Sequence, residues 1–184
     1  ILGCTHYPFY KNIFAQKLNE LYNLKENEKY VYRNVMNNEI ILIDDYSTDR
    51  TQALAKKLEF KFYSRSLDDD FSSQRNFGLS KTRNNYVLFL DQDEVFSMDL
   101  KTELFTMDLK EIDGLRILRV EHLLGKKVSY GEYRNFRLVR FANKAKGRWN
   151  GKVHEVWKID GKVVDSKGHI IHSSHSTVSD YLIK

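Results

Sequence analysis

The stretch Tyr86-Val-Leu-Phe-Leu-Asp-Gln-Asp-Glu94 combines the clearest buried strand of the sequence with a carboxylate cluster directly after it. A second run of this kind, Glu39-Ile-Ile-Leu-Ile-Asp44, lies earlier in the chain. Short, uninterrupted apolar runs are typical of strands covered on both faces in a parallel sheet. Helix patterns follow at 51–58 and from about 70 to 83, with a weaker strand at 60–63. This alternation predicts an α/β fold with a mostly parallel central sheet.

Beyond residue 100 the pattern favours strands over helices. Residues 115–123 and 134–141 alternate in the manner of half-buried strands. The pair Asp160-Gly161 is a strong hairpin signal and predicts that strands at 152–159 and 162–164 pair with each other. We therefore expect the later part of the chain to add further strands to the α/β core.

The composition excludes several classes of protein. A length of 184 residues suits one domain of ordinary size, and 41% hydrophobic residues are enough for a core. With 9 Gly and 1 Pro, the chain is not of a fibrous or low-complexity type. No run of about 18 uncharged apolar residues is present, which argues against a membrane span. The single cysteine, Cys4, cannot form an internal disulfide and indicates a reducing, cytoplasmic compartment.

The positive charge is concentrated in one part of the sequence. The formal net charge is +5, yet residues 116–152 hold 11 Lys and Arg against Glu121 and Glu132 alone, a local balance of +9. One interpretation is a set of strands with a solvated basic face. The other is a surface for an anionic partner, such as phosphate groups, an acidic lipid headgroup or nucleic acid.

Carboxylates follow two of the predicted strands. Asp44-Asp45 ends one of them, and Asp91-Gln-Asp93-Glu94 ends another. In open α/β sheets, ligands bind outside the carboxyl ends of the strands. An Asp-x-Asp pair there offers hard oxygen ligands to Mg²⁺ or Mn²⁺, which could bridge a diphosphate. The alternative is that these side chains only cap turns, although like charges gathered at one edge are costly without a cation.

These segments resemble the conserved blocks of family 2 glycosyltransferases, which have the GT-A fold. Ile41-Leu-Ile-Asp-Asp-Tyr-Ser-Thr-Asp-Arg-Thr51 resembles a signature of that family. Phe71-Ser-Ser-Gln-Arg-Asn-Phe-Gly-Leu79 and Val87–Glu94 are similar to the next two blocks in order and spacing. The resemblance implies a GT-A-like, nucleotide-sugar-binding domain over 39–184, with a donor half at 39–100 and an acceptor half at 101–184.

The later motifs resemble a narrower branch, the bacterial lipopolysaccharide core β-glucosyltransferases and their relatives. The residues concerned are Gly147-Arg-Trp-Asn-Gly-Lys-Val-His-Glu155, Ile171-His172 and Asp180-Tyr-Leu182. This resemblance implies an acceptor that is a bacterial surface glycan, either free or lipid-linked, rather than nucleic acid.

The resemblance also implies roles for the donor-side residues. Asp44 or Asp45 would hold the uracil or ribose of a nucleotide-sugar, and the choice between them stays open. Arg75 would meet the nucleotide or its phosphates. Asp91 and Asp93 resemble the DxD pair, with Asp93 favoured as the direct ligand of Mg²⁺ or Mn²⁺. The metal would neutralise charge on the departing nucleoside diphosphate.

Family 2 enzymes invert the anomeric carbon by direct displacement, so one carboxylate must take the proton of the acceptor hydroxyl. We assign that role to Glu155, with a salt-bridged surface glutamate as the alternative. His172 would complete the metal shell or touch phosphate, unless it is structural. His154 is a weaker candidate for substrate binding. Trp149 would stack on a sugar ring or fill the core.

The front of the chain, 1–38, departs from the family pattern. Ile1-Leu-Gly-Cys-Thr-His-Tyr-Pro8 resembles a motif of glutamate/aspartate racemases, in which the cysteine is one of two acid/base thiols. Because Cys4 is the only cysteine, racemase activity is disfavoured. Either this segment is the remnant of a neighbouring or fused gene, or Ile1–Cys4 replaces the usual first strand and Phe9–Leu24 forms its helix.

We therefore predict an inverting, metal-dependent glycosyltransferase that uses a UDP-sugar and a bacterial surface-glycan acceptor such as lipopolysaccharide core. The alternative is an inactive or truncated fragment, cut at both ends, that acts at most as a module binding nucleotide or anionic glycan. We expect the protein in the cytoplasm, with peripheral contact at the anionic inner face of the membrane through the +9 segment.

Overall fold

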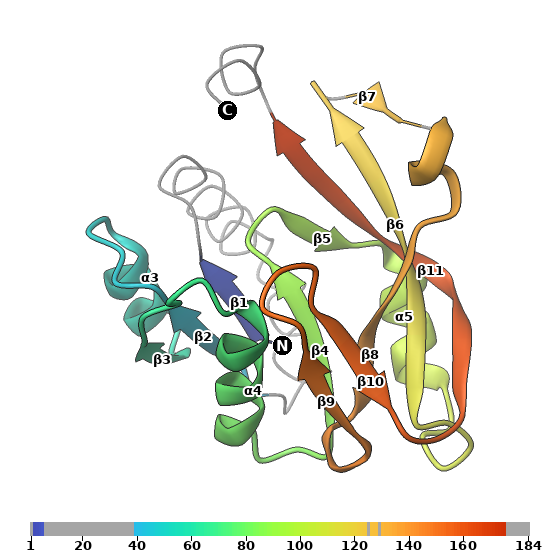
Figure 1. Cartoon of the computed structure of the whole chain (residues 1–184), viewed down its shortest axis with the longest axis horizontal. Helices are drawn as coiled ribbons and strands as arrows, with labels where there is room; N and C mark the ends of the chain where they lie inside the picture. Colours follow the sequence, from blue (N-terminus) through green and yellow to red (C-terminus); the bar gives the residue numbers. More distant parts are fainter. Residues whose placement is uncertain (1, 6–38, 125, 129, 176–184) are drawn as a thin grey trace. The chain divides into compact units, whose positions relative to one another are not determined.

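The structure is a computed structural model that describes residues 2–5, 39–124, 126–128 and 130–175 (Figure 1). The chain forms two compact units, each built from two separate stretches. The first unit comprises Ile1–Gln92 and Trp149–Glu155. The second unit comprises Asp93–Arg148 and Val156–Lys184.

The first unit contains a parallel sheet with the strand order β3-β2-β1-β4. Its strands are β1 (Leu2–Thr5), β2 (Ile41–Asp44), β3 (Lys61–Ser64) and β4 (Tyr86–Asp91). All four residues of β2 are buried, as are the four central residues of β4. The apolar runs are therefore the strands of a covered parallel sheet, and the prediction of an α/β fold is confirmed.

Strand β1 lies in the middle of this sheet. Leu2 stands opposite Ile41 of β2 on one side and Phe89 of β4 on the other. This is the place that the replacement-strand interpretation gives to the start of the chain. The helix expected at 9–24 lies outside the described residues.

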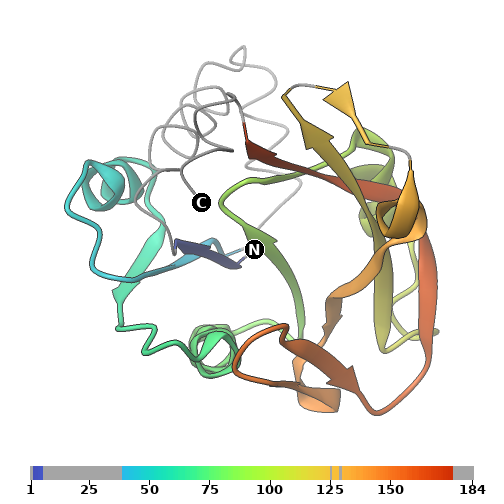
Figure 2. The same cartoon turned by 45° about the horizontal axis from the view of Figure 1, so that its top comes forward.

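The helices of the first unit, α3 (Thr51–Lys57) and α4 (Phe71–Lys81), cover opposite faces of its sheet (Figure 2). Asp70 caps α4 by accepting a hydrogen bond from the Ser73 N–H at 2.8 Å. This bond and one from the Ser72 hydroxyl lower the pKa of Asp70, against a smaller opposing effect of burial. Capping by Asp70 fixes where α4 begins and thus which of its side chains face the sheet.

The second unit contains a mixed sheet in the order β8-β6-β11-β5, with β7 paired to β6. Its strands are β5 (Glu94–Phe96), β6 (Gly114–Leu123), β7 (Lys126–Lys127), β8 (Arg137–Asn143) and β11 (Val163–His175). Strand β10 (Val156–Ile159) lies outside this sheet, and β9 (Gly147–Asn150) has residues in both units. The 3-10 helices η2 (Gly131–Asn135) and η3 (Lys144–Lys146) lie between strands. Helix α5 (Met98–Thr106) packs against β11.

The hairpin predicted at Asp160-Gly161 is wrong. The strand that follows it, β11, pairs with β6 and β5, and its first residue Val163 stands opposite Gly114. The Lys162 N–H donates to Oδ2 of Asp113 at 2.8 Å, and the Asp113 N–H donates to the Lys162 carbonyl. These bonds hold the start of β11 beside β6, so β11 pairs with a distant strand and not with the strand just before it.

None of the helices in the described ranges is long and apolar enough to cross a bilayer.

At Gly168 the backbone of β11 comes close to α5. A Cβ at this position would overlap the backbone and Cβ of Leu100, which is fully buried. Replacing Gly168 with Ala is therefore expected to destabilise the fold by about 1–3 kcal/mol, the usual cost of overpacking. Urea unfolding of Gly168→Ala measures this, with the exposed neighbour Lys167→Ala as control. Equal unfolding midpoints for the two variants would show that α5 can move away at no cost.

Candidate active site

Asp44 and Asp45 lie at the carboxyl end of β2, where both accept backbone hydrogen bonds. Oδ2 of Asp44 accepts from the Ser47 N–H at 2.7 Å, and the side chain is buried. Oδ1 of Asp45 accepts from the Leu67 N–H at 3.1 Å, and this residue is half-buried. Asp44 thus shapes the turn after β2, whereas Asp45 is the more accessible of the two carboxylates.

Arg75 of α4 is the centre of a second group of predicted site residues in the first unit. Its Nε donates to Oε1 of Glu155 at 2.7 Å, and its Nη2 donates to Oδ1 of Asp91 at 2.9 Å. Arg75 is only 3% exposed, so both ion pairs form where little water reaches the guanidinium. In the structure Arg75 joins two predicted site carboxylates of its own chain, and its predicted contact with nucleotide or phosphate stays a prediction.

Trp149 completes the surroundings of Arg75. The guanidinium lies 4.6 Å from the centroid of the Trp149 ring, within the range of a cation–π interaction. The ring also packs edge-on against Phe89, with centroids 5.0 Å apart, and Trp149 is 4% exposed. In this arrangement Trp149 packs in the core and presents little surface on which a sugar could stack, which favours the core-filling alternative of the prediction.

Asn76 is a site residue that the sequence interpretation missed. Its Nδ2 donates to the Trp149 carbonyl at 2.9 Å, and its Oδ1 accepts from the Trp149 N–H at 3.1 Å. The Phe71 N–H at the start of α4 donates to the Lys152 carbonyl. Helix α4 therefore holds the 149–155 segment and with it Glu155. The position of Asn76, directly after Arg75 in a family block, is the signal that could have identified it.

His154 lies in the turn that leads to Glu155. Its φ of 56° is in the left-handed region, and its side chain is exposed. No hydrogen bond or ion pair places His154 with the Arg75 group among the described residues. The predicted role of His154 in substrate binding therefore stays a prediction.

In the second unit, Asp93 and His172 lie at the start of a chain of hydrogen-bonded charges. The His172 imidazole lies between two carboxylates, with Nε2 3.0 Å from Oδ2 of Asp93 and Nδ1 2.5 Å from Oε2 of Glu121. The Arg119 Nε donates to the other Glu121 oxygen at 2.6 Å. His172 of β11 stands opposite Glu121 of β6 in the parallel register, which explains their contact.

The two carboxylates determine the charge of His172. Burial acts to lower the pKa of the imidazole, but the hydrogen bonds with Asp93 and Glu121 outweigh it and raise the pKa to about 9. Burial likewise acts to raise the pKa of Glu121, whereas its bonds with His172 and Arg119 bring it below the usual value. At neutral pH His172 is thus an imidazolium that donates from both nitrogens.

Glu94 adds a buried carboxylate to the second unit. The Arg140 Nη2 donates to it at 3.2 Å, and the Arg119 guanidinium lies 3.8 Å away. The sequence interpretation assigned no role to Arg119, Glu121 or Arg140. Arg119 and Glu121 are two residues apart on one strand and so share a face. That spacing is the sequence feature that could have predicted their contact.

Asp91 and Asp93 thus have different partners. Asp91 binds Arg75 in the first unit, and Asp93 binds His172 in the second. Among the described residues, no three His, Cys, Asp or Glu side chains are grouped in a way that could hold a metal ion.

Comparison with known protein families identifies the family of the chain. Residues 8–151 match the family described as glycosyl transferase family 2. A TPR repeat-containing protein of Synechococcus elongatus is 33% identical over 120 residues, which are 64% of this chain and 28% of that protein.

The fold is similar to that of S. aureus TarS 1–349, whose crystal structure was solved in complex with UDP-GlcNAc. The TM-score is 0.61 at 13% identity, and the match covers 98% of this chain and 59% of that one. The chain thus spans about a quarter of the Synechococcus relative and more than half of TarS 1–349. The α/β fold described above is of the GT-A type, and the chain belongs to glycosyl transferase family 2.

Proposed function

We propose that the chain is the catalytic domain of an inverting, metal-dependent glycosyltransferase. It would move a sugar from a UDP-sugar to a bacterial surface glycan such as lipopolysaccharide core. The observation that carries this proposal is the convergence of Asp91 and Glu155 on the buried Arg75. Asp91 ends β4, and ligands of open α/β sheets bind outside the carboxyl ends of the strands. The UDP-GlcNAc bound by TarS supports a nucleotide-sugar as the donor.

Glu155 would act as the general base. The Arg75 guanidinium binds Oε1, so Oε2 is the oxygen that would accept the proton of the acceptor hydroxyl. As that proton leaves, the hydroxyl oxygen attacks the anomeric carbon and the bond to the UDP oxygen breaks on the opposite side. Arg75 and Asn76 are positioning residues here, since they hold Glu155 through its side chain and its segment. Asp44 or Asp45 would bind the nucleoside, with Asp45 favoured by its greater accessibility.

A Mg²⁺ or Mn²⁺ ion would supply positive charge for the diphosphate leaving group. The carboxylate of Asp93 fits such an ion, because it offers hard oxygens and its side chain is 16% exposed. His172 fits as a second ligand only after its Nε2 loses the proton that Asp93 accepts. Asp91 is the other proposed ligand. Magnesium sites commonly use one or two carboxylates together with substrate phosphates, which agrees with the absence of a three-residue group in the described ranges.

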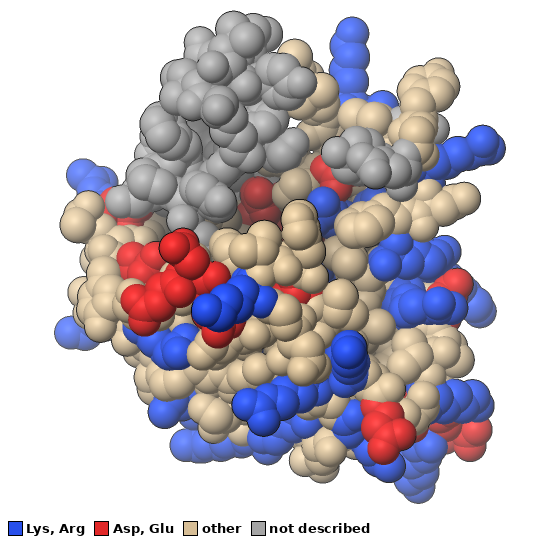
Figure 3. All heavy atoms as spheres, viewed as in Figure 1, with Lys and Arg blue, Asp and Glu red and all other residues tan. Residues whose placement is uncertain are grey.

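The basic residues of the second unit would face the acceptor. Figure 3 shows Lys and Arg side chains spread over the face in view of this unit. Exposed examples are Arg116, Lys126, Lys127, Arg134, Lys146 and Lys158. We propose that they attract an anionic glycan or lipid-linked glycan at the cytoplasmic face of the membrane. Such attraction weakens as salt is raised.

The proposal is tested by UDP-glucose and UDP-GlcNAc hydrolysis and transfer with and without Mn²⁺. Asp93→Asn is expected to lower the Mn²⁺-dependent rate by at least about tenfold. Mutation of a residue that only hydrogen-bonds to a metal ligand already costs about that much in metal affinity or activity, and loss of the ligand itself should cost more. Asp160→Asn, an exposed aspartate of the same unit, is the matched control. An unchanged rate in Asp93→Asn would remove the metal role. Mn²⁺-dependent UDP binding without any turnover would instead favour the binding-module alternative.

A further inference from the structure

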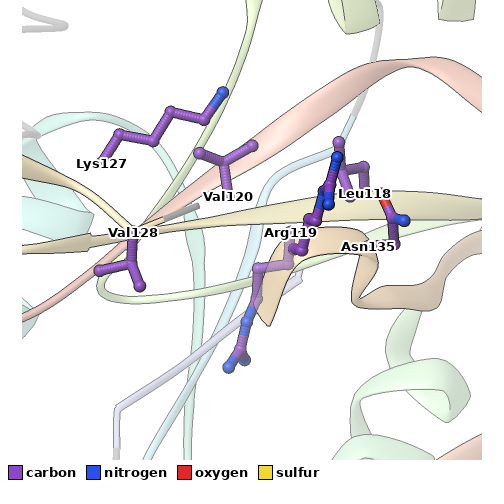
Figure 4. Close-up of a pocket in the computed structure, with 7 residues that line it drawn as sticks. Leu118, Arg119, Val120, Lys127, Val128 and Asn135 are labelled. Atoms are coloured by element: carbon purple, nitrogen blue, oxygen red, sulfur yellow. The ribbon is translucent and has the colours of Figure 1, made fainter. Parts of the chain in front are cut away.

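A pocket of about 220 Å³ opens beside β6 in the second unit. Its lining combines three cationic residues, Arg119, Lys127 and Arg134, with Asn135 and a few apolar side chains of the adjoining strands (Figure 4). None of the described residues that line it carries a carboxylate. A small, positively charged recess of this kind selects for a compact anionic group.

The pocket exists because the pairing along one edge of β6 is interrupted. Strand β8 pairs with β6 only as far as Leu118, and β7 pairs with it again from His122. Between these two ladders, the Arg119 N–H donates to the Phe136 carbonyl and the Val128 N–H donates to the Glu121 carbonyl. The η2 helix spans this interruption and brings Arg134 and Asn135 to the pocket. The course of the backbone therefore forms the recess.

The three cationic residues differ in how strongly they are already neutralised. Arg119 is half-buried and bound to Glu121, with Glu94 3.8 Å away, so much of its charge is balanced. Lys127 and Arg134 are exposed. Positive charge for a ligand therefore comes mainly from Lys127 and Arg134, while Arg119 can offer further donors from its guanidinium fork.

Two exposed aromatic residues flank η2, the helix that contributes Arg134 and Asn135 to the pocket. Tyr130 precedes the helix and is 83% exposed, and Phe136 follows it, with the Arg119 guanidinium 5.1 Å from its ring centroid. Exposed rings that flank cationic groups suit a ligand with both a ring face and an anionic group. Arginine and lysine are the residues that bind phosphate oxygens best.

We propose that this pocket binds a phosphate group carried by the acceptor glycan. The assignment of the ligand to the acceptor rests on the proposed function, whereas phosphate binding itself does not. The pocket also connects to the candidate active site of its unit, because Arg119 begins the hydrogen-bonded series that continues through Glu121 and His172 to Asp93. A phosphate that binds Arg119 would compete with Glu121 for the guanidinium.

The test is calorimetric titration of the full chain with glucose 6-phosphate, with glucose and inorganic phosphate as references. Saturating UDP and Mn²⁺ are present to occupy the donor site. Lys127→Gln/Arg134→Gln is expected to weaken glucose 6-phosphate binding by about tenfold or more, the effect of losing charge-assisted hydrogen bonds. Lys56→Gln/Arg83→Gln also removes one lysine and one arginine charge, from exposed positions of the first unit that have no proposed part in acceptor binding, and is expected to leave the affinity within about twofold.

Equal weakening by both double variants would overturn the proposal, because it would show a general attraction to positive charge. Binding of glucose as tight as that of glucose 6-phosphate would overturn it too. Co-sedimentation with phosphatidylglycerol vesicles that depends on Lys127 and Arg134, without glucose 6-phosphate binding, would assign the pocket to a lipid headgroup instead. UDP binding is measured in every variant, so a failure of the donor site is seen separately from a failure of the pocket.

Discussion

Replacing Glu155 with Gln is expected to lower sugar transfer by about 10²- to 10⁴-fold, the usual contribution of a general base. The amide has nearly the same shape as the carboxylate, and its oxygen can still accept the hydrogen bond from the Arg75 Nε that now reaches Oε1. The side chain should therefore stay in place while it loses the ability to take up a proton. UDP binding is expected to remain, since no nucleotide contact is assigned to Glu155.

Single-turnover transfer and calorimetric UDP binding measure the two expectations separately. Glu111→Gln is the matched control, because that side chain is exposed and lies outside both groups of site residues. If Glu155→Gln retains near-normal transfer, another group is the base. If transfer and UDP binding fall together, Glu155 serves the structure of the site rather than proton transfer.

The sequence predicts the elements of the first unit well because each of them carries its own local signal. The run before Asp44 contains no polar residue after Glu39, and the structure buries all four residues of β2. Asp70 precedes a helix pattern, and it caps α4. Continuous apolar runs and capping residues report on the backbone directly.

Pairings between distant strands have no comparable local signal. Asp160-Gly161 favours a hairpin, yet the strand after it pairs with β6, some fifty positions earlier in the chain. That pairing is supported by contacts such as the hydrogen bond from the Lys162 N–H to Asp113. A short stretch of sequence around Lys162 gives no sign of this contact. Strand existence was therefore predictable, and strand partners were not.

For the candidate site, too, the sequence predicts which residues take part but not how they contact one another. Motif resemblance points to Arg75, Asp91, Asp93, Glu155 and His172 as site residues. It does not predict that Arg75 binds Glu155, or that His172 lies between Asp93 and Glu121. These contacts join positions about 50 to 80 residues apart, and they depend on the register of β11 against β6 and on how α4 holds the 149–155 segment.

Replacing Arg75 with Met is expected to cost about 3–5 kcal/mol of unfolding free energy, the usual penalty for removing one partner of a buried ion pair. Methionine fills much of the volume beside Phe89 and Trp149 but leaves Asp91 and Glu155 without the guanidinium that now binds both. The Asp91 side chain is 24% exposed and can recover some hydration, which places the expected cost toward the lower end.

Urea unfolding of Arg75→Met, Glu155→Gln and the double variant forms a cycle that isolates the coupling between the two residues. Arg116→Met is the control, because Arg116 pairs with Asp165 on the exposed surface of the second unit and should cost less than about 1 kcal/mol. If the buried pair is strong, Glu155→Gln should recover part of the stability that Arg75→Met loses, since the uncompensated charge is then gone. Additive losses would show instead that Arg75 acts mainly by packing on Trp149. In that case Glu155 would be positioned by its backbone segment, and the Asn76 bonds to Trp149 would be the contacts on which the candidate base depends.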